Sequence, residues 1–127
     1  MRQIISRHTA LVLVAIGWSL STGGVQADPG TAKVVGLGAT SCSRFADDVR
    51  RSPAIQRDYL AWAQGFMSGV LLGRLPGVDN DLDLNPALFG LLKQLEFLRA
   101  YCAEHSSKSF SNAAQALYKR LRREGAT

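Results

Sequence analysis

One stretch limits the fold of this chain more than any other: residues 59–73, which read YLAWAQGFMSGVLLG. Between its ends only Gln64 and Ser68 are polar, so a helix formed here is apolar on almost every side. A helix of this kind belongs in the middle of a domain, surrounded by other elements. It is too short to cross a bilayer, which takes about 20 apolar residues. We therefore expect a central helix enclosed by the rest of the domain.

Small residues recur at every fourth position of the same stretch, at Ala61, Gly65, Gly69 and Gly73. On a helix they form one smooth stripe that allows a neighbouring backbone to come close. Each interior glycine weakens an isolated helix by roughly 1 kcal/mol relative to alanine, so this helix needs partners. We predict that Gly65, Gly69 and Gly73 are helix-packing positions, either inside one chain or between two copies in a homodimer.

The N-terminus has the pattern of an export signal. Arg2 and Arg7 precede a short apolar run over residues 10–20, and a cleavage-site triplet ends at Ala27. This order is typical of a secretory signal peptide. We predict a signal peptide over residues 1–27, a periplasmic location and no stable membrane span after cleavage. An uncleaved membrane anchor is the alternative.

The charge of the exported chain is smaller than that of the precursor. The full sequence has 15 Lys and Arg against 10 Asp and Glu. Because Arg2 and Arg7 leave with the signal, 13 basic and 10 acidic residues remain, and the formal charge becomes +3. This value supports solubility and does not indicate nucleic acid. We expect one small domain without a nucleic-acid partner.

The chain has two cysteines, Cys42 and Cys102. In an exported protein the expected state of such a pair is one disulfide. A disulfide between these two cysteines would close a loop of 60 residues. Closing a loop of this length stabilises the fold by roughly 4 kcal/mol in the chain-entropy description. A metal site would need further Cys or His ligands at short spacing, and His105 is the one histidine after residue 27. We therefore expect a disulfide, no metal ion and no other cofactor.

Caps and periodicity predict four helices after a leader. Residues 28–40 are rich in glycine and small residues without a helical period, so we expect a flexible leader. Two later sites combine a favoured N-cap with proline at the first helical position. The first predicted helix covers residues 41–51, and the second begins at Ser52-Pro53. The third runs from Asn85-Pro86 to about residue 104, and the fourth begins at Ser109 or Ser111. The fold class is all-α: a small four-helix domain over residues 41–127, closed by one disulfide.

Each predicted helix has an apolar face with steps of three and four residues, which we expect to form the core. In the first helix the face consists of Cys42, Phe45 and Val49. In the central helix it consists of Ile55, Tyr59, Trp62, Phe66 and Val70. In the third helix it consists of Leu88, Leu91, Leu95, Leu98 and Cys102. In the last helix it consists of Phe110, Ala113, Ala114, Leu117 and Leu121.

An acidic loop follows the central helix. Its polar residues are Asp79, Asn80, Asp81 and Asp83. Exposed loops often carry recognition, so we predict that these four residues contact a partner. A calcium loop is the alternative, but its sixth and twelfth positions call for Gly and Glu, and this chain has Leu84 and Gly90 there.

The last helix ends in a basic cluster formed by Lys119, Arg120, Arg122 and Arg123. Such a cluster can bind anionic lipid or nucleic acid, and it also complements the negative end of the helix dipole. No aromatic residues interleave with it as a nucleic-acid surface would require, so we favour the dipole.

These features together resemble the Rap/Tai family of periplasmic immunity proteins, which protect bacteria from type VI secretion amidase effectors. The resemblance rests on an early Cys42, the motif at residues 62–69, the acidic loop, Tyr101-Cys102, and Ala113-Ala114 with Leu117 and Leu121. It implies a small all-helical protein, often disulfide-bonded and often dimeric. It also implies a function without catalysis, in which the protein covers the active-site cleft of an amidase.

The second resemblance is to the HdeA/HdeB acid-stress chaperones, which are small exported helical proteins with one disulfide. It implies binding of stress-unfolded clients through apolar surface released at low pH. An enzyme is the third hypothesis and the one we disfavour. Ser68 lies in G-x-x-S-G inside a predicted helix, whereas a nucleophile elbow needs G-x-S-x-G after a strand. We assign no catalytic residue and expect a protein partner, either a secreted amidase effector or an unfolded client.

Overall fold

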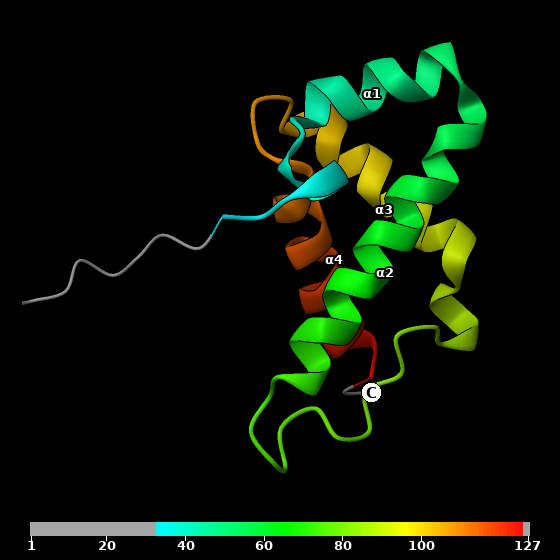
Figure 1. Ribbon diagram of the computed structural model, residues 1–127. Coiled ribbons are helices and arrows are strands. Elements are labelled where there is room, and N and C mark those ends of the chain that lie inside the picture. The colour runs from blue at the N-terminus through cyan, green and yellow to red at the C-terminus, as the bar shows by residue number, and fades with distance from the viewer. Residues whose placement is uncertain (1–32, 126–127) are drawn as a thin grey trace, which may run out of the picture. The chain divides into compact units, whose positions relative to one another are not determined.

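The computed structural model describes residues 33–125. The predicted signal peptide, residues 1–27, and the first part of the leader lie outside the described residues. Within them the fold is all-α, as predicted, with α1 (Cys42–Arg51), α2 (Gln56–Leu72), α3 (Leu91–Glu104) and α4 (Phe110–Glu124) (Figure 1). Three 3₁₀ turns accompany them, η1 (Gly36–Ala39), η2 (Pro53–Ile55) and η3 (Ala87–Phe89). Among these helices none is long and apolar enough to span a membrane.

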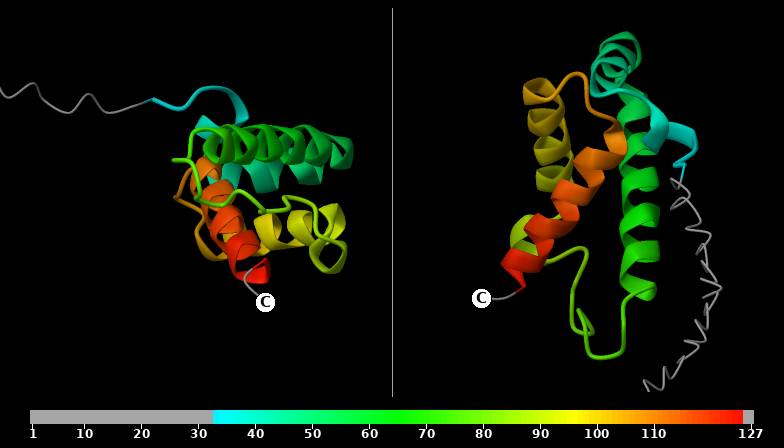
Figure 2. Two further views of the ribbon diagram at one scale, coloured as in Figure 1. Left: turned by 90° about the horizontal axis from the view of Figure 1, so that it is seen from below. Right: turned by 90° about the vertical axis from the view of Figure 1, so that its left-hand side faces the viewer.

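Helix α4 is the centre of this domain. It packs against α1, α2, α3 and η1, and Figure 2 shows it between α2 and α3. The side chains of its predicted inner face are all fully buried: Phe110, Ala113, Ala114, Leu117 and Leu121. Ser109 begins the helix with a capping box, in which it and Asn112 satisfy each other's backbone groups. The two adjacent alanines leave room for neighbouring helices to approach.

Helix α2 was predicted to be enclosed, and that prediction is wrong. It buries only one stripe, formed by Tyr59, Ala63 and Met67. The other members of its predicted face are partly buried, and Leu72 is 86% exposed. Alanine and glycine make the stretch look apolar, but they carry little side-chain area and lose little when water covers them. Low polarity therefore did not require burial on every side.

The glycine stripe of α2 faces outward, so of the two alternatives predicted for it, packing inside one chain finds no support among the described residues. A methyl group added at Gly65 or Gly69 would meet no heavy atom within 4 Å. At Gly73 the nearest atom is the carbonyl oxygen of Gly69, 3.3 Å away in the same helix. Within the described residues no other helix uses this stripe. Packing of Gly65, Gly69 and Gly73 between two copies stays a prediction.

A close approach occurs instead at Gly38. A methyl group there would lie 1.9 Å from Cη2 of Trp62, so only glycine allows the backbone of η1 to lie on the indole ring. Because η1 packs on α2 and α4, the predicted boundary between a leader at residues 28–40 and a domain at residue 41 is too late. The folded part includes Gly36–Ala39, whose small residues were read as a sign of flexibility.

The Cys42–Cys102 disulfide forms as predicted and joins α1 to α3, with Cα atoms 4.7 Å apart. Backbone hydrogen bonds strengthen the same corner. The Cys42 amide donates to the carbonyl of Lys108 at 2.8 Å, and the Phe110 amide donates to that of Thr40 at 2.8 Å. The start of α1 is therefore tied both to the end of α3 and to the start of α4.

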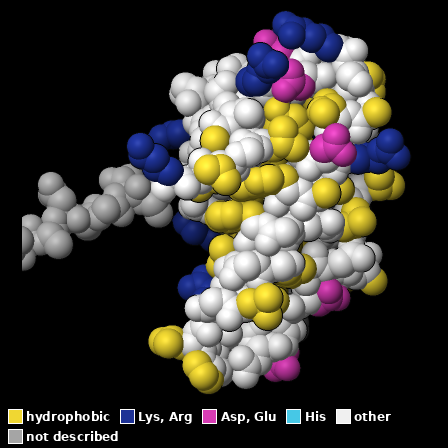
Figure 3. All heavy atoms as spheres, in the orientation of Figure 1, with side chains coloured by type: hydrophobic (Ala, Val, Ile, Leu, Met, Phe, Trp, Pro, Cys, Tyr) yellow, Lys and Arg dark blue, Asp and Glu magenta, His cyan; other side chains and the backbone are white. Residues whose placement is uncertain are grey.

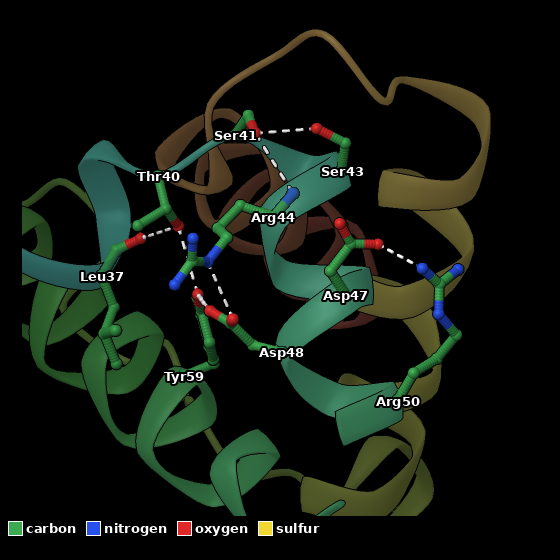
Figure 4. A network of polar contacts seen from close by, with 9 residues as sticks. All are labelled: Leu37, Thr40, Ser41, Ser43, Arg44, Asp47, Asp48, Arg50 and Tyr59. Atoms are coloured by element: carbon green, nitrogen blue, oxygen red, sulfur yellow. Dashed lines mark hydrogen bonds and ion pairs between the residues drawn. The ribbon is translucent and has the colours of Figure 1, made fainter. Parts of the chain in front are cut away.

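A polar network covers this corner (Figure 4). The Tyr59 hydroxyl donates to Oδ2 of Asp48 at 2.9 Å, and Nε of Arg44 donates to Oδ1 of Asp48 at 2.8 Å. Ser41 caps α1 by accepting the amide of Arg44 at 3.1 Å. Burial raises the pKa of the Tyr59 hydroxyl, the Thr40 contact lowers it, and the Asp48 carboxylate raises it further. The folded state therefore favours the protonated, neutral form of the Tyr59 hydroxyl.

Helix α3 differs from its prediction at the N-terminal end. It begins at Leu91 because η3 precedes it, and Leu88 is 82% exposed rather than part of the seam. The inward position is occupied by Gln94, which is fully buried. Its Nε2 donates to the carbonyls of Leu84 at 2.9 Å and Phe89 at 3.1 Å. A polar side chain therefore holds the preceding loop where an apolar seam was expected.

Candidate interaction surface

The segment between α2 and η3, residues 73–86, runs past the C-terminal ends of α2 and α4 (Figure 1). The backbone of this segment turns sharply at two positions, since φ is 86° at Gly77 and 59° at Asp79. A positive φ suits glycine and is tolerated by Asp when its side chain is held. The segment therefore depends on a local anchor rather than on regular structure.

That anchor is the Asp79 carboxylate. Oδ2 accepts a hydrogen bond from the Tyr118 hydroxyl at 2.9 Å, and Oδ1 accepts one from Nε of Arg122 at 2.7 Å. Nε of Arg74 lies 3.4 Å from Oδ2. The Asp79 side chain is only 9% exposed. It was predicted to face a partner, but it is taken up by contacts within the chain.

These contacts set the protonation of Asp79. Partial burial by itself raises the pKa of the carboxyl group. The hydrogen bonds from Tyr118 and Arg122, with the charges of Arg122 and Arg74, outweigh burial and lower the pKa below its ordinary value. The carboxylate is therefore charged at neutral pH, when it latches the loop to α4.

The other predicted loop residues behave differently from Asp79. Oδ1 of Asn80 accepts the Gly77 amide at 3.2 Å, and Oδ1 of Asp83 accepts the Asn85 amide at 2.7 Å, so both shape the loop. Asp81 is exposed and makes no hydrogen bond or ion pair with any described residue. Asp81 therefore remains available to a partner, and Asp83 keeps its second carboxylate oxygen, Oδ2, outside the hydrogen bond to Asn85.

Exposed apolar side chains adjoin the loop. Leu72 is 86% exposed, Leu75 is 76% exposed and Val78 is 37% exposed. Hydrophobic side chains also gather along the face on which α2 lies, with few charges between them (Figure 3). Large apolar residues grouped on a surface mark contact sites more often than single ones do. We define Leu72, Leu75, Asp81 and Asp83 as the loop surface.

The C-terminal halves of α2 and α4 diverge toward their ends (Figure 2). Side chains of both helices line a groove between them. It has a volume of about 270 Å³ and is lined by Phe66, Val70, Arg74, Gln115, Tyr118, Lys119 and Arg122. No pattern in the sequence predicts this groove. Its walls come from two helices far apart in the chain, and Arg122 in its wall pairs with Asp79, which lies 43 residues away in the sequence. No sequence pattern within a single helix or loop predicts a contact between residues so far apart in the chain.

No protein-family model, curated protein or solved structure matches this chain. Among the described residues, no group of three or more His, Cys, Asp or Glu side chains could hold a metal ion.

Proposed function

We propose that this chain is a small exported binding protein without catalytic activity, which acts by covering a protein partner. The observation that carries the proposal is the loop surface, where Leu72 and Leu75 are exposed next to a loop that carries the carboxylates of Asp81 and Asp83. Apolar anchors with charged neighbours are typical of protein contacts, in which the charges steer association. The disulfide supports an oxidising location such as the periplasm.

The most specific form of the proposal follows from the resemblance to the Rap/Tai family. The partner would then be a secreted cell-wall amidase, and the carboxylates of Asp81 and Asp83 would meet a basic rim of its cleft. The outward glycine stripe of α2 supports the homodimer that the same resemblance implies, because nothing in the described chain covers it.

Immunity is tested by co-expressing the protein with periplasm-directed amidases encoded beside its gene, with cell lysis and pull-down as readouts. We expect rescue by the natural chain and loss of rescue when Leu72→Ser, Leu75→Ser and Asp81→Lys are combined. The matched control combines Leu88→Ser, Leu92→Ser and Glu96→Lys on η3 and α3, also an exposed surface. Equal rescue by both triple variants would remove the loop surface from the proposal, and no rescue by the natural chain would remove immunity.

The Asp79 latch favours a second candidate, an acid-stress chaperone. Its carboxylate becomes neutral at low pH, and the loop that it holds includes Leu82 and Leu84, which pack against the core. Release would add their apolar surface to that of Leu72 and Leu75. A titration with an environment-sensitive dye from neutral pH to pH 2, together with a client-aggregation assay, tests this candidate. A chain that binds no more dye in acid than at neutral pH is not such a chaperone.

A further inference from the structure

The groove between α2 and α4 has a rigid apolar floor. Phe66 stacks on Trp62, with ring centroids 5.3 Å apart, and Tyr118 is 3% exposed, with its hydroxyl held by Asp79. Val70 completes the floor and is partly buried. Phe66 and Val70, which are only partly buried, present the apolar surface of the groove, whereas Tyr118 lies beneath it.

The rim of the groove is cationic. Arg74, Lys119 and Arg122 line it, and no acidic residue does. Arg74 and Arg122 share the Asp79 carboxylate. Lys119 is exposed and makes no hydrogen bond or ion pair with any described residue, so its ammonium group is free for a ligand.

A wider hollow of about 780 Å³ shares Lys119 and Arg122 with the groove and adds Arg123 and the loop. The groove and the hollow together are lined by four cationic side chains and by two carboxylates, those of Asp79 and Asp81. The cationic side chains are Arg74, Lys119, Arg122 and Arg123. The two hollows are neighbours that meet at Lys119 and Arg122, and we call them together the track: an apolar groove over Phe66 and Val70, and a positively charged hollow at the end of α4.

We propose that this track binds a peptide segment of a partner protein, in which apolar residues are followed by acidic ones. The apolar part would fill the groove over Phe66 and Val70, and the acidic part would lie over Lys119 and Arg123. A groove of about 270 Å³ is small for a drug-sized ligand, whose pockets run from roughly 300 to 1,000 Å³. It suits a few side chains of an amphipathic helix laid along it.

Binding in the track can be tested apart from the loop surface, because Lys119 and Arg123 line only the track and Leu72 and Leu75 belong only to the loop surface, although Asp81 belongs to both. A partner can use one without the other. The charge complementarity selects the occupant, since a basic segment of the same hydrophobicity would meet Lys119 and Arg123 at close range.

The test uses the disulfide-bonded chain from residue 28 onward and a fluorescein-labelled helical peptide with leucines in its first half and glutamates in its second. The control peptide replaces every glutamate with lysine. In fluorescence anisotropy at about 50 mM salt, we expect the acidic peptide to bind at least tenfold tighter, with the difference shrinking at high salt. Amide shifts on binding should be concentrated at Val70, Gln115 and Lys119.

Charge-reversal variants assign the site. Lys119→Glu combined with Arg123→Glu should lower affinity for the acidic peptide at least tenfold. Arg57→Glu combined with Lys108→Glu makes the same charge change at exposed positions outside the track and should leave affinity within about twofold. Circular dichroism verifies that both variants are folded.

Three results would overturn the proposal. The first is equal affinity for the glutamate and lysine peptides. The second is an equal loss of affinity in both charge-reversal variants. The third is binding to phosphatidylglycerol vesicles, lost in Lys119→Glu/Arg123→Glu, without binding to either peptide, which would assign the track to an anionic lipid.

Discussion

Two glycines of this chain have opposite surroundings, although the sequence gives them the same appearance. Gly38 lies against the ring of Trp62, where a methyl group would fall 1.9 Å from a carbon atom. Gly65 lies in the middle of α2, where a methyl group would meet nothing within 4 Å. The first needs the absence of a side chain, and the second bears the entropic cost of glycine without a packing reason inside the chain.

We therefore expect Gly38→Ala and Gly65→Ala to shift stability in opposite directions. Gly65→Ala should stabilise the domain by about 0.5–1 kcal/mol, since alanine is the better helix former at an open position. Gly38→Ala should destabilise it by at least about 2 kcal/mol, because η1 and the indole ring must separate. Urea unfolding monitored by tryptophan fluorescence measures both. A stabilising Gly38→Ala would show that η1 does not lie on Trp62.

The Asp79 latch makes the loop sensitive to acid. Because the pKa of Asp79 is lower in the folded state than in the unfolded state, its contribution to stability is present above the unfolded value of about 3.8. The contribution is lost as pH falls through the lower, folded value. We expect amide protection of residues 77–82 to be high at neutral pH and lost in strong acid.

Hydrogen exchange followed by mass spectrometry measures this protection. In Asp79→Asn the loop should be poorly protected at every pH, because a neutral amide loses the ion pairs with Arg122 and Arg74. Asp81→Asn is the control and should behave like the natural chain. If Asp79→Asn kept full protection at neutral pH, the carboxylate would not be the anchor of the loop.

At the scale of the helices, α4 takes the central, buried position that the apolar sequence of α2 predicts for α2. α4 has mixed polarity, yet it buries seven residues and contacts every other α-helix. α2 has the more apolar sequence, yet it buries three. Amphipathic α4 places all its large apolar side chains on one stripe, so one orientation buries them together. α2 spreads its apolar residues around the helix, so any orientation leaves some in water.

A matched pair of leucine truncations measures this difference. Leu117→Ala on α4 should cost about 2–5 kcal/mol, because the side chain is fully buried in the core. Leu72→Ala on α2 should change stability by no more than about 0.5 kcal/mol, because the side chain is 86% exposed. Thermal unfolding of both variants provides the comparison. A large loss with Leu72→Ala would mean that α2 is covered in solution, for instance by a second copy.

At the scale of the whole domain, one corner holds the helices together. The disulfide, the backbone bonds of Cys42 and Phe110, and the network around Tyr59 all lie where α1 meets the α3–α4 turn. The opposite end, with the loop surface and the track, is held by the side-chain hydrogen bonds of Asp79, Asn80, Asp83 and Gln94. The disulfide and the proposed interaction surfaces therefore lie at different ends of the domain.

Removing the disulfide should destabilise the domain globally rather than locally. Its loop spans 60 residues, and the chain-entropy description gives roughly 4 kcal/mol for such a loop. We expect Cys42→Ala/Cys102→Ala to lower the free energy of unfolding by about 2–5 kcal/mol. Denaturant unfolding with and without reductant measures it. Equal stability of the reduced and oxidised natural chain would show that the other contacts of this corner are sufficient.

The sequence by itself determined the features that depend on neighbours along the chain. The cap at Ser109 placed the start of α4, the three–four period found the buried faces of α1 and α4, and the cysteine count predicted the disulfide. Only the tertiary structure decided that α2 lies outside, that Gly38 rather than Gly65 meets a neighbour, and that Asp79 binds Arg122 instead of a partner. These outcomes depend on which surfaces meet across 24 to 43 residues, where geometry and not local propensity selects the contact.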